Sequence, residues 1–166
     1  RGIPAPAAPQ PKASSIESGA TDTASADPAD EPRLVAHDRA KRRYIAPDRP
    51  FLAALGVTDA QHHVIPAMAR KWKQINKFVE IFDHALAASP LAQQPQLRVL
   101  DFGCGKGYLT FAVHEHLTRA LAREVEVIGV ELRGDLVRQC NGVAQRLALD
   151  GLSFEQGDVR DRKSVV

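Results

Sequence analysis

The 166-residue sequence has little cysteine and no long apolar segment. Its two cysteines, Cys104 and Cys140, do not have the spacing of metal ligands, and such sparse cysteine is typical of a protein in a reducing compartment. No stretch approaches the roughly 18 consecutive apolar residues of a membrane-spanning helix. The N-terminus also lacks the charged start and apolar run of a secretory signal peptide. These absences predict a cytoplasmic protein with no membrane segment and no metal site.

The overall composition is that of a globular protein, with 44% hydrophobic and 25% charged residues. The net charge of +2 is unevenly distributed. Residues 1–32 contain two basic and five acidic side chains, a net charge of −3, so the remaining residues carry +5. A mildly basic domain of this kind permits a polyanionic partner without requiring one.

Composition divides the chain into three parts. Residues 1–32 are rich in Ala, Pro and Ser and are predicted to be a disordered tail, because they contain too few large apolar side chains to form a core. Residues 33–96 are predicted to be a helical leader segment, and residues 97–166 the N-terminal half of an α/β domain. Because the chain starts at Arg1 and the pattern stops after a third strand, we expect it to be a fragment.

The leader contains one strong helix signal, over residues 67–88. Large apolar residues recur there at steps of three and four, which places them on one side of a helix. These residues are Met68, Trp72, Ile75, Val79, Phe82 and Leu86.

Strand and helix patterns alternate from Leu97 onward. Strands are predicted at 97–102, 125–132 and 152–155, and helices at 107–122 and 135–149, where the dipeptide Asp150-Gly151 ends the second helix. This order predicts a Rossmann-like parallel sheet with right-handed crossovers, truncated after the third strand. The first strand is expected at a sheet edge, although its Val- and Leu-rich run predicts burial on both faces.

A glycine-rich loop follows the first strand, in the sequence Asp101-Phe-Gly103-Cys-Gly105-Lys-Gly107. Alternate glycines let the backbone turn sharply and approach a ligand closely. A dinucleotide-binding loop has the pattern G-x-G-x-x-G, but the third glycine position holds Tyr108. A tight turn without a ligand remains the structural alternative.

Acidic residues follow the other two strands. Glu131 ends the second strand, where a carboxylate can accept hydrogen bonds from both ribose hydroxyls of a nucleoside. Asp158 follows the third strand. The alternative for Glu131 is an exposed acid at the end of a strand, and the alternative for Asp158 is an ordinary loop aspartate.

The pattern D-x-G-x-G-x-G from Asp101 resembles motif I of the class I S-adenosylmethionine-dependent methyltransferases. Segments 42–45, 50–58, 71–80 and 129–137 resemble one methyltransferase-domain family, which includes the methyltransferase-like 25 group. The resemblance covers about residues 40–159 and makes residues 97–166 the N-terminal half of a methyltransferase domain. It implies S-adenosyl-L-methionine as the cofactor. The implied cofactor-binding residues are Asp101, Gly103, Gly105, Gly107, Glu131 and Asp158.

Some of these roles have a physical rationale. Asp101 would repel a diphosphate but suits the α-ammonium group of a methionine moiety. Asp158 is implied to contact the adenine amino group. The helix over 67–88 resembles the family's leader helix, which implies cofactor contacts from Lys71, Gln74 and Asn76.

The predicted function is methyl transfer to an unidentified acceptor, with no catalytic residue assigned. Names of some relatives indicate adenine methylation in ribosomal RNA, and the basic cluster over 39–43, with the cations of helix 67–88, could receive RNA phosphates. RNA is therefore a candidate acceptor. Two alternatives remain open: a non-catalytic cofactor-binding or interaction module, and an NAD-dependent oxidoreductase.

Overall fold

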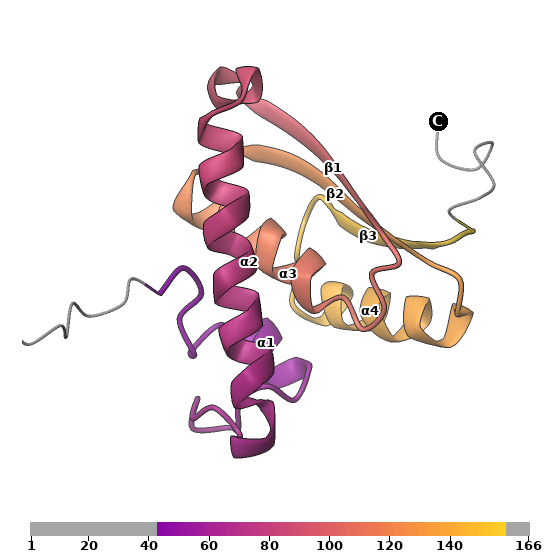
Figure 1. Ribbon diagram of the computed structural model, residues 1–166. Coiled ribbons are helices and arrows are strands. Elements are labelled where there is room, and N and C mark those ends of the chain that lie inside the picture. Colours follow the sequence, from indigo (N-terminus) through magenta and orange to yellow (C-terminus); the bar gives the residue numbers. More distant parts are fainter. Residues whose placement is uncertain (1–42, 159–166) are drawn as a thin grey trace, which may run out of the picture. The chain divides into compact units, whose positions relative to one another are not determined.

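The computed structural model describes residues 43–158 (Figure 1). The chain divides into two units, Arg1–Arg39 and Ala40–Val166, and all the described residues belong to the second. The predicted tail over 1–32 lies outside the described residues, as do most of the basic cluster over 39–43 and the end of the chain from residue 159.

The described residues form a mixed α/β fold with the predicted order of elements. Their bounds are α1 (Pro50–Ala54), η1 (Pro66–Met68), α2 (Ala69–Ala87), η2 (Pro90–Gln93), β1 (Gln96–Phe102), α3 (Tyr108–Glu115), η3 (His116–Ala120), β2 (Glu124–Glu131), α4 (Gly134–Arg146) and β3 (Leu152–Gln156). The three strands are parallel and pair in the order β1-β2-β3. The predicted Rossmann-like parallel sheet and helical leader are therefore confirmed.

Two helices end differently from the prediction. The helix expected over 107–122 is an α-helix only to Glu115 and continues as the π-helical segment η3. The helix expected to reach residue 149 ends at Arg146. Gly151, which was predicted to end this helix, lies immediately before β3 and has a φ of +75°. A side chain at this position would collide with the carbonyl oxygen of Val125.

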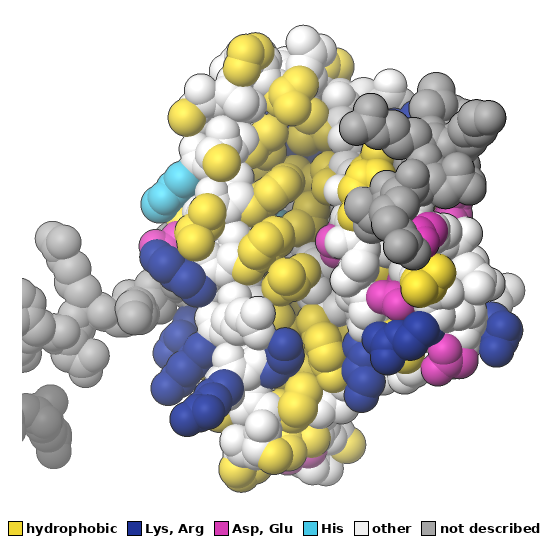
Figure 2. Space-filling view, turned by 45° about the vertical axis from the view of Figure 1, so that its right-hand side comes forward, with side chains coloured by type: hydrophobic (Ala, Val, Ile, Leu, Met, Phe, Trp, Pro, Cys, Tyr) yellow, Lys and Arg dark blue, Asp and Glu magenta, His cyan; other side chains and the backbone are white. Residues whose placement is uncertain are grey.

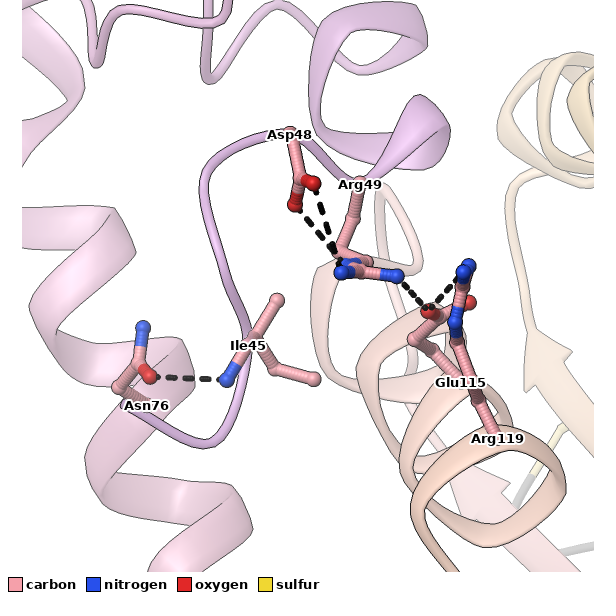
Figure 3. A network of polar contacts seen from close by, with 6 residues as sticks. All are labelled: Ile45, Asp48, Arg49, Asn76, Glu115 and Arg119. Atoms are coloured by element: carbon pink, nitrogen blue, oxygen red, sulfur yellow. Dashed lines mark hydrogen bonds and ion pairs between the residues drawn. The ribbon is translucent and has the colours of Figure 1, made fainter. Parts of the chain in front are cut away.

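The helix α2 packs its apolar side against the rest of the domain, as the spacing predicted. Ile75 and Val79 are fully buried, and the other members of the apolar stripe pack against the same core. Asn76 is also buried, and its Oδ1 accepts a hydrogen bond of 3.0 Å from the backbone N–H of Ile45 (Figure 3). Asn76 therefore fastens the segment before α1 to α2, and the cofactor contact implied for this residue stays a prediction.

An arginine network fastens the same segment to α3. One guanidinium N–H of Arg49 donates to Glu115 at 3.3 Å, while its Nε lies 3.1 Å from Asp48 (Figure 3). Arg119, one turn beyond Glu115, approaches the same carboxylate at 3.7 Å. The leader segment, α2 and α3 are thus joined by polar contacts as well as by the core.

The helices α3 and α4 lie on one face of the sheet, because right-handed crossovers between neighbouring strands place both connections on the same side. Phe111 of α3 packs on Phe154 of β3 with ring centroids 5.2 Å apart. On the opposite face of β1, Leu100 and Phe102 are 37% and 46% exposed. The predicted edge position of the first strand is correct, but its predicted burial on both faces is wrong.

Among the described residues, no helix combines the length and apolar character needed to cross a membrane.

Candidate functional site

The predicted glycine loop leaves the carboxyl end of β1 and crosses the end of β2. The backbone N–H groups of Gly103 and Cys104 donate to the carbonyl oxygen of Val130, at 2.7 and 3.2 Å. Because the loop is hydrogen-bonded to the neighbouring strand, its position is set by the sheet before α3 begins at Tyr108.

The three loop glycines have left-handed backbone conformations, with φ values of 73°, 58° and 72° at Gly103, Gly105 and Gly107. Side chains rarely adopt this region, which explains why glycine occupies all three positions. A Cβ at Gly103 or Gly105 would meet nothing within 4 Å, but one at Gly107 would lie 3.0 Å from the ring of Phe154. The first two glycines therefore leave open space for a ligand, whereas the third permits close packing against the core.

Glu131 ends β2 beside this loop and is only 8% exposed. Its Oε2 accepts a hydrogen bond of 2.9 Å from the N–H of Gly105. Its Oε1 accepts from the backbone N–H and the Nε of Arg133, at 3.1 and 3.2 Å. The backbone N–H of Arg133 is the main cause of a lowered pKa at Glu131, and the Arg133 side chain and Gly105 also contribute. The carboxylate is therefore ionised and ties the loop to β2.

These contacts do not use the full capacity of the Glu131 carboxylate. A carboxylate offers about four acceptor positions, and three N–H donors occupy its two oxygens here. One acceptor position of the carboxylate therefore remains for a ribose hydroxyl. The hydrogen bond from the N–H of Gly105 would link a ligand bound there to the loop.

Asp101 is the penultimate residue of β1 and lines a cavity of about 280 Å³ together with Gly103 and Gly105. The buried hydroxyl of Thr110 donates to its Oδ2 at 2.6 Å, which holds the carboxylate in one orientation. The helix α2 contributes Lys71 and Gln74 to the opposite wall.

The structure brings the six predicted residues to one edge of the sheet, but only Asp101, Gly103 and Gly105 line the cavity. Gly107 lies beneath it, against the core. Asp158 follows Gly157, whose N–H donates to the backbone carbonyl of Glu131 at 3.2 Å, so it also belongs to this edge. Whether these residues bind the cofactor stays a prediction.

Sequence reasoning missed two residues that orient the acids, Thr110 and Arg133. Thr110 lies nine positions after Asp101, and no motif marked it. Glu131 and Arg133 lie two residues apart in the sequence, so an acid followed two residues later by an arginine was the available signal.

Cys104 also lines the cavity, as a neutral thiol. Burial raises its pKa to about 12, and the charge of Asp101 adds to the effect. The thiolate that a nucleophile or metal ligand requires is therefore disfavoured at neutral pH. Among residues 43–158, no group of three or more His, Cys, Asp or Glu is placed to hold a metal ion.

The comparison with protein families identifies the domain. A family described as a methyltransferase domain matches residues 70–165, which is more than half of the chain. This protein therefore belongs to that methyltransferase-domain family, as its motif predicted, and S-adenosyl-L-methionine is the cofactor expected for it. No curated protein matches the chain.

Several solved structures are similar to parts of the chain. The YcgJ protein from Bacillus subtilis is 27% identical over 45% of this chain and 30% of its own, with a TM-score of 0.31. A putative sarcosine dimethylglycine methyltransferase from Galdieria sulphuraria is 16% identical over 52% of this chain and 30% of its own, with a TM-score of 0.41. A SAM-dependent methyltransferase from Aquifex aeolicus is 13% identical over 67% of this chain and 43% of its own, with a TM-score of 0.36. This chain thus spans less than half the length of each.

Proposed function

We propose that this protein transfers a methyl group from S-adenosyl-L-methionine to an acceptor, and that the cofactor binds at the carboxyl edge of the sheet. Membership of the methyltransferase-domain family is the observation that carries the proposal. When bound, this cofactor supplies an electrophilic methyl group on a sulfonium sulfur.

The residues at this edge fit such a cofactor. The open space beside Gly103 and Gly105 lets the loop backbone approach a ligand closely. The oriented carboxylate of Asp101 suits an ammonium group, and the remaining acceptor position of Glu131 suits a ribose hydroxyl. Asp158 would face the adenine. Their part in the reaction is to bind and orient, because the sulfonium methyl is already activated.

The same residues argue against the NAD-dependent alternative. A pyrophosphate binds free N–H groups at a helix start without a nearby anion. Here the carboxylate of Asp101 lines the cavity at the start of α3, and the N–H of Gly105 is already bonded to Glu131. A non-catalytic cofactor-binding module remains distinguishable by experiment, since it would bind the cofactor without methylating any acceptor.

The first test is calorimetric binding of S-adenosylhomocysteine and, separately, NAD. We expect S-adenosylhomocysteine to bind, and Glu131→Ala to weaken its binding by about 2–4 kcal/mol through the loss of hydrogen bonds to a charged group. Glu126→Ala is the matched control, because Glu126 is an exposed acid on the same strand that pairs with Arg98 instead. Unchanged affinity in Glu131→Ala would refute the ribose assignment, and binding of NAD alone would refute the proposed function.

For the acceptor, we propose RNA. The first nine residues of α2 carry four cations and no acid, namely Arg70, Lys71, Lys73 and Lys77. Figure 2 shows Lys and Arg side chains gathered over the lower part of the molecule. Arg43, the one described member of the predicted basic cluster, stacks over the ring of Trp72 at 4.5 Å. Cations grouped beside the candidate cofactor site support a partner with a phosphate backbone.

Filter binding of a short RNA at several salt concentrations tests this acceptor. We expect affinity to fall steeply as salt rises, and the double variant Arg70→Glu/Lys77→Glu to weaken binding uniformly across sequences. Affinity that is indifferent to salt and to the charge reversal would contradict an RNA acceptor. The predicted cytoplasmic location stays a prediction.

A further inference from the structure

A second cavity, of about 270 Å³, lies between the segment before α1 and the end of α3 with η3. Its lining residues are Arg43, Tyr44, Ala46, Arg49, Glu115, His116, Arg119 and Ala120. Among the residues that the structure describes, none is shared with the cavity beside the glycine loop. Arg119 lies eleven residues beyond Tyr108, where α3 begins, and is therefore roughly 15 Å farther along the helix. A ligand in this cavity would bind at a different place from the proposed cofactor.

Cations outnumber acids in the wall of this second cavity. The wall contains three arginines and, among the described residues, one acid, Glu115. Arg49 and Arg119 come from different elements and converge on the Glu115 carboxylate, at 3.3 and 3.7 Å (Figure 3). Arg49 also pairs with the exposed Asp48, which is outside the wall, at 3.1 Å. Arg119 forms no hydrogen bond within residues 43–158, so its guanidinium N–H groups remain available to a ligand.

The imidazole of His116 belongs to the same wall and is only 3% exposed. Its Nε2 lies 2.7 Å from Oδ1 of Asp83 on α2, whereas its Nδ1 is buried and has no hydrogen-bond partner among the described residues. A buried polar atom without a partner is destabilising, and a water or an ion commonly accounts for such an atom. In an imidazolium both ring nitrogens donate, so Asp83 would accept one N–H and an anion in the cavity the other.

The helix is irregular where it forms this wall. The α-helical pattern of α3 ends at Glu115, and η3 is π-helical. The backbone N–H of Leu121 donates to the carbonyl oxygen of His116 at 3.1 Å, a hydrogen bond that spans five residues. Single π-helical turns within helices occur frequently at functional sites. Here the π-helical turn contains both His116 and Arg119, so it places two of the wall's donor groups.

The size and charge of the cavity limit the ligand. About 270 Å³ is below the range of about 300–1,000 Å³ that is typical of pockets for larger organic ligands, so a small group fits best. Guanidinium groups bind phosphate through paired N–H···O hydrogen bonds. A phosphate also offers more acceptor oxygens than a carboxylate, and three separate donor groups converge here, namely Arg49, Arg119 and His116.

We propose that this second cavity binds a phosphate group through Arg49, Arg119 and His116. In the free protein, Glu115 is the internal anion that holds the two arginines together, and it competes with the ligand. A free phosphate ion and a phosphate of an RNA chain share this chemistry, and the experiment below separates them. The inference does not require the proposed methyl transfer, because no residue of the cavity beside the glycine loop takes part.

Calorimetric titration with inorganic phosphate tests this site. We expect Arg119→Met to raise the Kd for phosphate about tenfold, as for a lost hydrogen bond between charged groups. The Arg119 side chain is 66% exposed, so this variant should fold normally. Glu115→Gln should instead lower the Kd several-fold, because it removes the competing charge and keeps a side chain of the same shape.

The matched control is Arg146→Met, which removes an exposed cation at the end of α4 that does not line this cavity. It should leave the Kd for phosphate unchanged. Equal losses in Arg119→Met and Arg146→Met would overturn the inference, since net charge alone would then attract the ion. Weaker binding in Glu115→Gln would overturn it as well, because the cluster would then have only a structural role. Failure of the wild-type protein to bind phosphate would also overturn it.

Filter binding of a short RNA at several salt concentrations identifies the source of the phosphate. For a phosphate of an RNA chain, Arg119→Met should reduce the slope of log affinity against log salt by about one. An unchanged slope in that variant, together with phosphate binding by the wild type, would assign the cavity to free phosphate. Absence of RNA binding by the wild-type protein would refute the proposed acceptor and would leave the phosphate result intact.

Discussion

The two faces of the sheet are built from the same three strands but have different surroundings. On one face, α3 and α4 cover Val127 and Phe154, which are nearly inaccessible. On the other face, the paired residues Arg98 and Glu126 form an exposed ion pair at 3.0 Å. The strands are rich in β-branched residues and leucine, and this composition favours burial. It does not indicate which of the two faces is covered by helices.

The candidate site depends on the covered face. The side chain of Asp101 is on the same face as Gly129 and Phe154, its register neighbours, and the glycine loop passes into α3 on that side. The uncovered face instead presents Leu100 and Phe102, which are exposed. Four predictions test how far the two faces differ.

The largest effect is expected from Phe154→Ala, on the covered face. Phe154 is 4% exposed and packs against Phe111, so its truncation should lower the free energy of unfolding by about 3–5 kcal/mol. Phe102→Ala, on the uncovered face, should cost less than about 1.5 kcal/mol because its side chain is already half in solvent. Urea denaturation of both variants measures the difference, and equal losses would show that the two faces are equally buried.

The next effect separates two glycines of the same loop. Gly107→Ala should lower stability by about 2–4 kcal/mol, because left-handed strain is combined with overpacking against Phe154. Gly105→Ala should cost about 1–2 kcal/mol, because it carries the strain alone. Thermal unfolding distinguishes them, and a larger loss in Gly105→Ala would contradict the packing role of Gly107.

A smaller and pH-dependent effect is expected from Glu131→Gln, which should cost about 1–2 kcal/mol at neutral pH. The pKa of Glu131 is lowered from its ordinary value of 4.5, chiefly by the N–H of Arg133, so ionisation favours the folded state. This contribution is complete above pH 4.5 and is lost as the pH falls through the lower pKa of the folded protein. The stability difference between wild type and Glu131→Gln should therefore shrink on acidification. A difference that stays constant between pH 7 and pH 3 would contradict the assigned cause.

The smallest effect belongs to the exposed ion pair of the uncovered face. Arg98→Ala should change stability by less than about 1 kcal/mol, because both side chains are more than half exposed and solvent screens the pair. Denaturation at low and high salt measures it. A loss above 2 kcal/mol that persists in high salt would show that this end of the face is covered.

The sequence predicted the parts of the fold that depend on local pattern. The apolar stripe of α2 and the three strands were located from periodicity, because a helix or strand must repeat its apolar residues to bury one side. The loop glycines were found from their spacing, because only glycine adopts three left-handed conformations so close together without strain.

The errors came from contacts between distant segments. The resemblance implied a cofactor contact for Asn76, which stays a prediction, but did not indicate that Asn76 accepts a hydrogen bond from the N–H of Ile45, 31 residues earlier. The predicted burial of Leu100 and Phe102 failed because the strand pattern contains no information on which helices cover a face. The partner of Asp101, Thr110, became visible only when α3 was placed against β1.

The sequence by itself determined the element order, the loop conformation and the methyltransferase-domain family, because each depends on residues close together in the chain. The tertiary structure alone decided which acids are held in place, which glycine packs against the core and which side chains of α2 line the cavity beside the glycine loop. Those properties depend on distances between separate elements, and hydrogen bonds, packing and charge pairing act over only a few ångströms.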